Sequence, residues 1–103
     1  DAVSECIQQN ITDSSFDVAM LAANLCMSRS NLYNKIKVLT GVSPVEFLRK
    51  FRINTAARML IETDMSVSQI IECVGIESAS YFSKVFKQEF GETPSEYQRQ
   101  RRG

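Results

Sequence analysis

The sequence contains no histidine and no tryptophan among its 103 residues, and only three cysteines. Histidine is the commonest general base and a frequent metal ligand, so its absence removes the usual centre for both kinds of chemistry. Cys6, Cys26 and Cys73 are odd in number, far apart and not arranged as a CxxC pair, which argues against a disulfide framework or a zinc site. We therefore expect buried reduced thiols, no enzyme activity, no metal and no cofactor.

Long apolar runs and an excess of either charge are also missing. No apolar run approaches the roughly 18 residues of a membrane-spanning helix, and no signal peptide is visible. Basic and acidic residues number 12 each, and a net charge of zero is poor support for a nucleic-acid binder. The length of 103 residues fits one compact domain or two very small ones that share a core. Because the first residue is Asp1 and not Met, we expect a piece of a longer cytoplasmic protein.

The charges that are present are sorted into blocks. Residues 18–45 and 47–61 contain bases and no acid, whereas residues 1–17 and 62–77 contain four acids each and no base. This sorting predicts one basic and one acidic face, although ordinary surface charge can produce the same blocks. Arg99, Arg101 and Arg102 end the chain, where we expect a frayed helix whose arginines either attract DNA or only solvate the surface.

Apolar residues recur every three or four positions and strand-type alternation is absent, which predicts an all-α fold of seven helices. Helix starts are predicted at the capping residues Asp17, Ser28, Ser43, Ser66, Ser78 and Thr93. Helix ends are predicted at Gly41, Gly75 and Gly91. The apolar stripes of the first and third helices are expected to be Val3, Cys6, Ile7 and Ile11, and Leu32, Ile36 and Leu39.

The segment SPVE at residues 43–46 is a strong helix start, with an N-cap serine, a proline at the first position and a capping-box glutamate. The helix that it opens is predicted to run to about Ile61. It is apolar on two sides, with Leu48 and Ala56 on one and Ile53 on the other. We therefore expect other helices to pack against both sides.

The two halves of the chain repeat each other. SRSNLYNKIKVLTGVSPVEF at 28–47 overlays SASYFSKVFKQEFGETPSEY at 78–97 with an offset of 50, while the offset upstream is 49. The second repeat therefore has one extra residue in its turn. Each repeat has the pattern of a helix-turn-helix, a short helix and a longer one joined by a tight turn. Cys26 stands where the second repeat has Gly75, so the first turn must form without a glycine.

The side of each longer helix that lies opposite its apolar stripe is free of acids. These outer faces consist of Ser30, Tyr33, Asn34 and Lys37 in the first repeat and Ser80, Ser83, Lys84 and Lys87 in the second. One such face alone would fit a solvated surface made soluble by lysine. The same pattern in the same register twice favours a surface that contacts phosphates and bases.

These residues resemble the DNA-binding domain of AraC/XylS-type transcription regulators. VGIESASYFSKVFKQEFGETPSEY is similar to the family's second helix-turn-helix and terminal motif, and RINTAARML at 52–60 is similar to its connecting helix. MSRSNLYNKIKVLTGVSPVEFLRKFR most resembles the output domains of hybrid two-component sensor-regulators. The chain departs from the family at Ile71 and Ile76, where Ala and Phe are usual, but both residues are apolar and can repack.

The resemblance implies two homeodomain-like three-helical units joined by a long helix. Subdomain 1 would span about residues 1–43, the linker helix about 44–61 and subdomain 2 about 62–103. It implies that both recognition helices enter adjacent major-groove segments of double-stranded DNA, on one side, to regulate transcription. Further implied partners are RNA polymerase and a second subunit, bound through regions outside this chain. The segment itself is expected to make no membrane contact.

By the same resemblance, the base-reading candidates are Ser30, Tyr33 and Asn34 on the first recognition helix and Ser80, Ser83 and Lys84 on the second. Asparagine can pair with adenine through two hydrogen bonds, and lysine can donate to guanine O6 and N7. The phosphate-contacting candidates are Lys37 and Lys87, one turn further along, and Ser28, Arg29 and Ser78 at helix N-termini. Arg49 and Lys50 either add nonspecific attraction or only solvate the surface.

Other function classes stay open at this point. A helical protein-interaction module, whose acid-free faces bind an acidic partner, would suit the zero net charge. A small enzyme or metal protein is disfavoured by the missing histidine and by the absence of a convergent carboxylate cluster. Within the DNA-binding interpretation, a stand-alone activator competes with the output domain of a larger signalling regulator.

Overall fold

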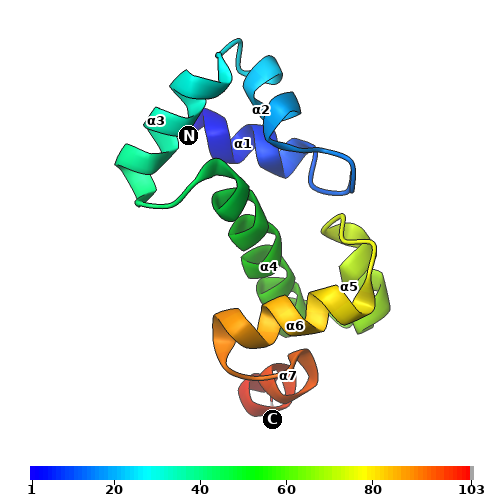
Figure 1. Cartoon of the computed structure of the whole chain (residues 1–103). Coiled ribbons are helices and arrows are strands. Elements are labelled where there is room, and N and C mark those ends of the chain that lie inside the picture. Colours follow the sequence, from blue (N-terminus) through cyan, green and yellow to red (C-terminus); the bar gives the residue numbers. More distant parts are fainter. Residues whose placement is uncertain (103) are drawn as a thin grey trace.

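The computed structural model describes residues 1–102, and within that range it contains seven helices and no strand. The helices are α1 (Ala2–Gln9), α2 (Val18–Asn24), α3 (Arg29–Thr40), α4 (Pro44–Glu62), α5 (Val67–Cys73), α6 (Ala79–Phe90) and α7 (Pro94–Arg102). The all-α prediction is confirmed. Figure 1 shows α4 as a central rod that joins a first half, α1–α3, to a second half, α5–α7. The molecule is accordingly elongated, with extents of 44 × 24 × 24 Å.

The predicted capping residues begin the helices as expected. The side chains of Asp17, Ser28, Ser43, Ser66, Ser78 and Thr93 each accept a hydrogen bond from the backbone N–H three residues later. The return bond of a full capping box is present at Ser66 and Thr93. The prediction of a full capping box at Ser43 is wrong. The Glu46 carboxylate makes no return bond to the Ser43 amide and lies 3.7 Å from the Arg49 guanidinium instead.

Two clusters of buried side chains form the core, one in each half. The first cluster contains Val3, Cys6, Ile7, Phe16, Val18, Leu21, Ala22, Leu32, Ile36 and Leu48. The second contains Ile11, Ile53, Ala56, Ala57, Leu60, Ile70, Ile71, Val74, Phe82, Val85 and Phe86. The helix α4 contributes to both, and its partly buried Phe51 packs against each. This confirms that other helices pack against more than one side of α4. Each large side chain that is fully buried there stabilises the fold by about 1.5–3 kcal/mol.

The predicted burials of Leu39 and of two cysteines are wrong, whereas Ile11 is buried as expected but in another place. Leu39 is 67% exposed, because it lines an open hollow beside the start of α1 and no described helix covers it. Ile11 is buried, but it lies after the end of α1 and packs in the second half's cluster. Of the cysteines, only Cys6 is buried, whereas Cys26 is exposed and Cys73 is half-buried.

The two helix-turn-helix turns share one backbone feature, a residue with positive φ after the shorter helix. Cys26 and Gly75 occupy equivalent positions and both have positive φ, 56° and 70°. Cys26 is the one described non-glycine residue with positive φ, a conformation that costs on the order of 1–3 kcal/mol for a side chain with a Cβ. The first turn therefore forms without its glycine, as the repeat required, at some cost in strain.

The C-terminal helix α7 is helical up to Arg102, its last described residue, and its arginines contact the rest of the domain. Arg102 lies 2.8 Å from the Asp64 carboxylate and donates to the Thr63 carbonyl. Arg101 lies 2.9 Å from the Glu92 carboxylate and stacks 3.9 Å above the centre of the Tyr97 ring. The expectation of a frayed, arginine-rich end was wrong because these arginines have partners inside the domain.

Candidate nucleic-acid interface

The structure leaves both outer faces open to solvent. All of the predicted contact residues are exposed, namely Ser28, Arg29, Ser30, Tyr33, Asn34, Lys37, Ser78, Ser80, Ser83, Lys84 and Lys87. The opposite sides of the same helices are buried, through Leu32 and Ile36 on α3 and through Phe82 and Phe86 on α6. Each 12-residue helix therefore presents the predicted polar face outward from a fixed apolar base.

The base of α6 is a cluster of aromatic rings. The ring of Phe86 has its centre 5.7 Å from that of Phe82, 4.7 Å from that of Phe90 and 5.3 Å from that of Tyr97, edge-on in the last pair. Such pairs contribute about 0.5–1.5 kcal/mol each beyond the area that they bury. They hold α6 against α7, so the positions of Ser83 and Lys84 on the outer side are well defined.

The N-termini of α3 and α6 are both exposed and open on the outer side. Ser28 accepts from the Asn31 amide and Ser78 accepts from the Tyr81 amide. The remaining first-turn amides and the helix dipole give these ends a partial positive charge, which suits a phosphate oxygen. At the start of α3, Arg29 adds a full charge.

Two hollows connect the recognition helices across α4. One, of about 490 Å³, is lined by Arg29, Tyr33 and Asn34 from α3 and by Val45 from the first turn of α4. The other, of about 340 Å³, is lined by Val45 and Arg49 from α4 and by Ser78 and Tyr81 at the start of α6. Since both hollows include Val45, the outer face of α3 and the start of α6 border neighbouring hollows on one side of α4.

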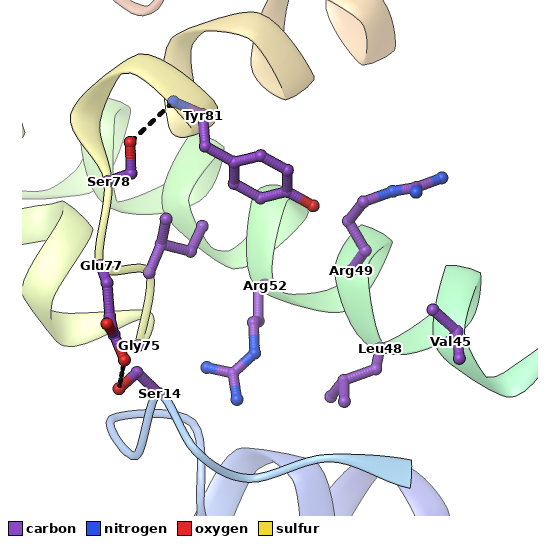
Figure 2. A pocket seen from close by; sticks show the side chains of 10 residues that line it. Ser14, Val45, Leu48, Arg49, Arg52, Gly75, Glu77, Ser78 and Tyr81 are labelled. Carbon is purple, nitrogen blue, oxygen red and sulfur yellow. Dashed lines mark hydrogen bonds between the residues drawn. The ribbon is translucent and has the colours of Figure 1, made fainter.

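Figure 2 shows the second hollow from close by, with the Tyr81 ring extending across α4 toward Arg49. Tyr81 is 49% exposed, and its backbone amide donates to the Ser78 hydroxyl. Tyr81 lies off the apolar stripe of α6, so its position in the sequence does not by itself indicate a role. The structure places Tyr81 on the wall of the second hollow, at the start of α6 and facing α4.

Four cations of the described chain, Arg49, Lys50, Arg101 and Arg102, have an ion-pair partner, whereas those of α3 and α6 have none. Within residues 1–102, no carboxylate oxygen lies within 4.0 Å of a lysine or arginine nitrogen on either helix. Arg49 and Lys50, in contrast, lie 3.7 and 3.9 Å from Glu46 and Glu89. The outer faces therefore carry unpaired positive charges, as do Lys35, Arg58 and Arg99 elsewhere in the described residues.

Lys87 has a carboxylate in its wider surroundings. The pKa of Glu96 is lowered chiefly by hydrogen bonds from the Thr93 backbone and side chain, with smaller contributions from the positive charges of Lys87 and Arg99. Part of the field of Lys87 is thus balanced within the domain. Lys84, one turn earlier, has no such neighbour among the described interactions.

Sequence reasoning missed the burial of Arg52, which it took as one base in a basic block and as a residue that matches the family's connecting helix. Arg52 is 7% exposed and donates hydrogen bonds to main-chain carbonyls of both halves. Burial lowers the pKa of Arg52, and the Asp13 carboxylate opposes that shift. A signal was present in the sequence, since Arg52 stands four residues from both Leu48 and Ala56 and so belongs to the apolar stripe of α4.

The described residues contain no group of three or more cysteine, aspartate or glutamate side chains that could hold a metal ion. None of the helices in residues 1–102 has the length and apolar character that crossing a membrane requires.

Comparison with known proteins decides the family. The sequence model of a family described as a helix-turn-helix domain matches residues 21–100. A transcriptional regulator from Chromobacterium violaceum, described as containing an AraC-type DNA-binding domain, superposes with a TM-score of 0.86 at 27% identity, covering 96% of this chain and 88% of that one. The chain belongs to the AraC-type helix-turn-helix family.

Two further relatives of this AraC-type domain bear on its use. The DNA-binding domain of AdpA, solved in complex with a target DNA, superposes with a TM-score of 0.83 at 28% identity, covering 97% of this chain and 92% of that one. Histidine kinase P4 of Formosa agariphila is 41% identical over 92 residues, which are 89% of this chain and 7% of that protein. The chain spans between 7% and 46% of the length of the first curated relatives that it matches.

Proposed function

We propose that this AraC-type domain binds double-stranded DNA sequence-specifically and thereby regulates transcription. The observation that carries the proposal is the pair of outer faces on α3 and α6, equivalent in register, free of acids and exposed on one side of α4. The α-helix is the element that the major groove admits. Two such helices about one DNA turn apart would contact major-groove segments roughly 10 base pairs apart.

Base reading and phosphate binding divide along each helix. Asn34 and Lys84 are exposed at equivalent positions and have the chemistry to select adenine and guanine, respectively. Tyr33 suits a thymine methyl group, whereas Ser30, Ser80 and Ser83 accept more than one base. The phosphate set is Lys37 and Lys87 with the helix starts Ser28, Arg29 and Ser78. Arg101 and Arg102 are left out of it because they are paired inside the domain.

The experiment is a binding titration on duplexes selected by this chain from a random pool, repeated over a series of salt concentrations. We expect log K to fall linearly with log salt, with a slope of about −0.9 for each phosphate neutralised and a handful of phosphates in total. A flat plot, or selection of no sequence, would contradict DNA binding and favour the protein-interaction module.

A matched pair of variants locates the contact surface. Lys37→Ala should weaken binding on every duplex and reduce the salt slope by about one phosphate. Lys35→Ala removes the same charge from the same helix, but Lys35 lines the hollow beside α1, away from the outer face. Equal losses in the two variants would mean that α3 attracts DNA only through its net charge.

We further propose that the domain is the output domain of a larger signalling regulator, with the stand-alone activator as the alternative. The similarity to a small part of a histidine kinase supports the larger protein. In that setting the domain lies in the cytoplasm with the chromosome, a second subunit binds through regions outside this chain, and RNA polymerase is a candidate partner at the promoter. The gene sequence upstream of the Asp1 codon tests this, since an in-frame receiver or kinase domain would support it and a stop codon would exclude it.

A further inference from the structure

The first and second halves touch each other away from α4, through the loop between α1 and α2. This crossing loop, residues 10–17, leaves the first half and reaches the turn between α5 and α6, as Figure 1 shows. Its residue Ile11 is 6% exposed and packs in the core of the second half. The Ser14 hydroxyl donates to the Glu77 carboxylate at 2.7 Å, at the exposed rim of the same contact.

Arg52 fills the space between the crossing loop, the second turn and α4. Its Nη1 donates to the Ile11 carbonyl at 2.6 Å and to the Val74 carbonyl at 2.5 Å. Its Nη2 donates to the Asp13 carbonyl at 3.0 Å and to the Phe16 carbonyl at 3.3 Å. In Figure 2 the side chain points from α4 toward the loop that carries Ser14 and toward the turn. One guanidinium thus bonds the first half, the second half and the helix that joins them.

The turn between α5 and α6 has room for the Arg52 side chain only because residue 75 is a glycine. A Cβ on Gly75 would lie 2.1 Å from Nη1 of Arg52 and 2.3 Å from the Ile11 carbonyl oxygen, so only glycine fits there. Glu77 follows within the same turn and is the extra residue of the second repeat, because the offset between the repeats changes from 49 to 50 after Ile76. The departure from the repeat therefore coincides with the contact between the halves.

We propose that Arg52 is a positioning residue that fixes the orientation of α6 relative to α3, and thereby sets the half-site spacing that the domain accepts on DNA. The proposal rests on the proposed function. Without the contact, the halves would be related by α4 alone, a single helix that can bend. A change of one base pair moves a half-site by about 3.4 Å and about 35° around the duplex, so even a small reorientation of α6 would alter the preferred spacing.

The test compares the wild-type chain with Arg52→Lys on duplexes that carry both selected half-sites, with one or two base pairs inserted or deleted between them. Lysine keeps the charge, but its three donors on one nitrogen cannot span the four carbonyls. We expect the wild type to lose about 10-fold or more in affinity per inserted base pair, and the variant about 3-fold or less. Both proteins should bind an isolated half-site within about 2-fold of each other, because the outer faces are unchanged.

Arg58→Lys is the matched control. It makes the same chemical change six residues along α4, where Arg58 is exposed and donates to Thr55 within its own helix. Its spacing profile should follow that of the wild type. If Arg52→Lys also gives the wild-type profile, or if it weakens the isolated half-site as much as the full site, Arg52 does not set the spacing.

A measurement without DNA separates this inference from the proposed function. Residual dipolar couplings of amides in α3 and α6 should fit one alignment tensor in the wild type and in Arg58→Lys, and two different tensors in Arg52→Lys. A single tensor in all three proteins overturns the positioning role of Arg52, whereas a wild type that binds no duplex overturns the proposed function and the spacing on DNA but not that positioning role. Should Arg52→Lys not fold, Ser14→Ala with Glu77→Ala breaks the exposed rim of the same contact and is expected to change both readouts in the same direction.

Discussion

The two helix-turn-helix halves present similar outer faces on differently built supports. In the first half the recognition helix is held by the aliphatic residues Leu32 and Ile36, whereas the second uses the packed rings around Phe86. The turn of the first half is strained at Cys26, while that of the second has Gly75. The repeat thus retains the side of the helix that faces away from the core and allows the buried side and the turn to vary.

The ends of the two recognition helices differ in the same way. Leu39, at the end of α3, is 67% exposed. Its equivalent Glu89 on α6 lies 3.9 Å from Lys50 of α4. The aromatic cluster around Phe86 extends to Tyr97 of α7, whereas the first half has no helix beyond α3 except α4 itself. We therefore expect substitutions in the second half to be the more costly for stability.

The largest expected effect is that of Phe86→Ala, which should lower the free energy of unfolding by about 3–5 kcal/mol through the lost ring and the cavity left behind. Ile36→Ala, the equivalent change in the first half, removes a smaller side chain and should cost less. Since α4 belongs to both cores, we expect one cooperative transition in urea, with amides of α3 and α6 sharing a midpoint. Separate midpoints in Phe86→Ala would show that the halves unfold independently.

The turns provide a second comparison, in which one substitution should lower the stability of the fold and the other should raise it. Gly75→Ala should destabilise by about 2 kcal/mol or more, because φ is positive there and the added Cβ meets Arg52 and the Ile11 carbonyl. Cys26→Gly relieves the positive φ of the first turn and should stabilise by up to about 1 kcal/mol, after the entropy cost of glycine. Thermal unfolding of the two variants beside the wild type measures both. A destabilised Cys26→Gly would show that the Cys26 side chain, not its backbone, matters in the first turn.

The outer faces provide the third comparison. Lys84 and Asn34 occupy equivalent positions. Replacing either with alanine should weaken the free energy of DNA binding by about 1–3 kcal/mol and relax the specificity at one base pair. The two base pairs should lie in different half-sites, one for each recognition helix. Titrations over single-base operator variants check this. A uniform loss over all variants would assign the residue to phosphate contact instead.

Local signals predicted the fold well because each helix has its own start, stripe and end within the sequence. The caps at Ser28 and Ser78 and the outer faces needed no tertiary information, because side-chain direction on a helix follows from spacing alone. The same reasoning failed where tertiary cover decides burial. Leu39 continues the stripe of α3, but no described helix covers that end.

The contact between the halves could not have been read from local pattern. Ile11 was assigned to the first helix because its spacing fits, yet it lies after the helix and packs in the other half. Arg52 was taken as one base in a basic block and as a match to the connecting helix, although its place on the apolar stripe of α4 also indicated burial. What distinguishes Arg52 is a set of carbonyls from positions 22 to 41 residues away, and sequence spacing carries no information about such contacts.

The smallest expected effect concerns the capping boxes that start α4 and α7. In the second half the Glu96 carboxylate accepts the Thr93 amide at 2.9 Å, while Glu46 in the first half makes no such return bond. Hydrogen bonds from Thr93 lower the pKa of Glu96 from its usual 4.5. A carboxyl whose pKa is lower in the folded state stabilises fully above its unfolded pKa, and that contribution is lost as the pH falls through the folded pKa.

Thermal midpoints of the wild type and Glu96→Gln should therefore differ above about pH 5 and converge as the pH falls below 4.5 toward the lowered pKa. Gln69→Glu is the complementary variant, because Gln69 makes the same return bond to the Ser66 amide without a charge. It should gain stability above pH 5 and lose that gain in acid, through the helix dipole. If the midpoints of Glu96→Gln stay parallel to the wild type down to pH 3, the carboxylate in this box adds no more than a neutral acceptor does. The capping boxes at the starts of α4 and α7 would then differ in hydrogen-bond geometry and not in electrostatic stabilisation.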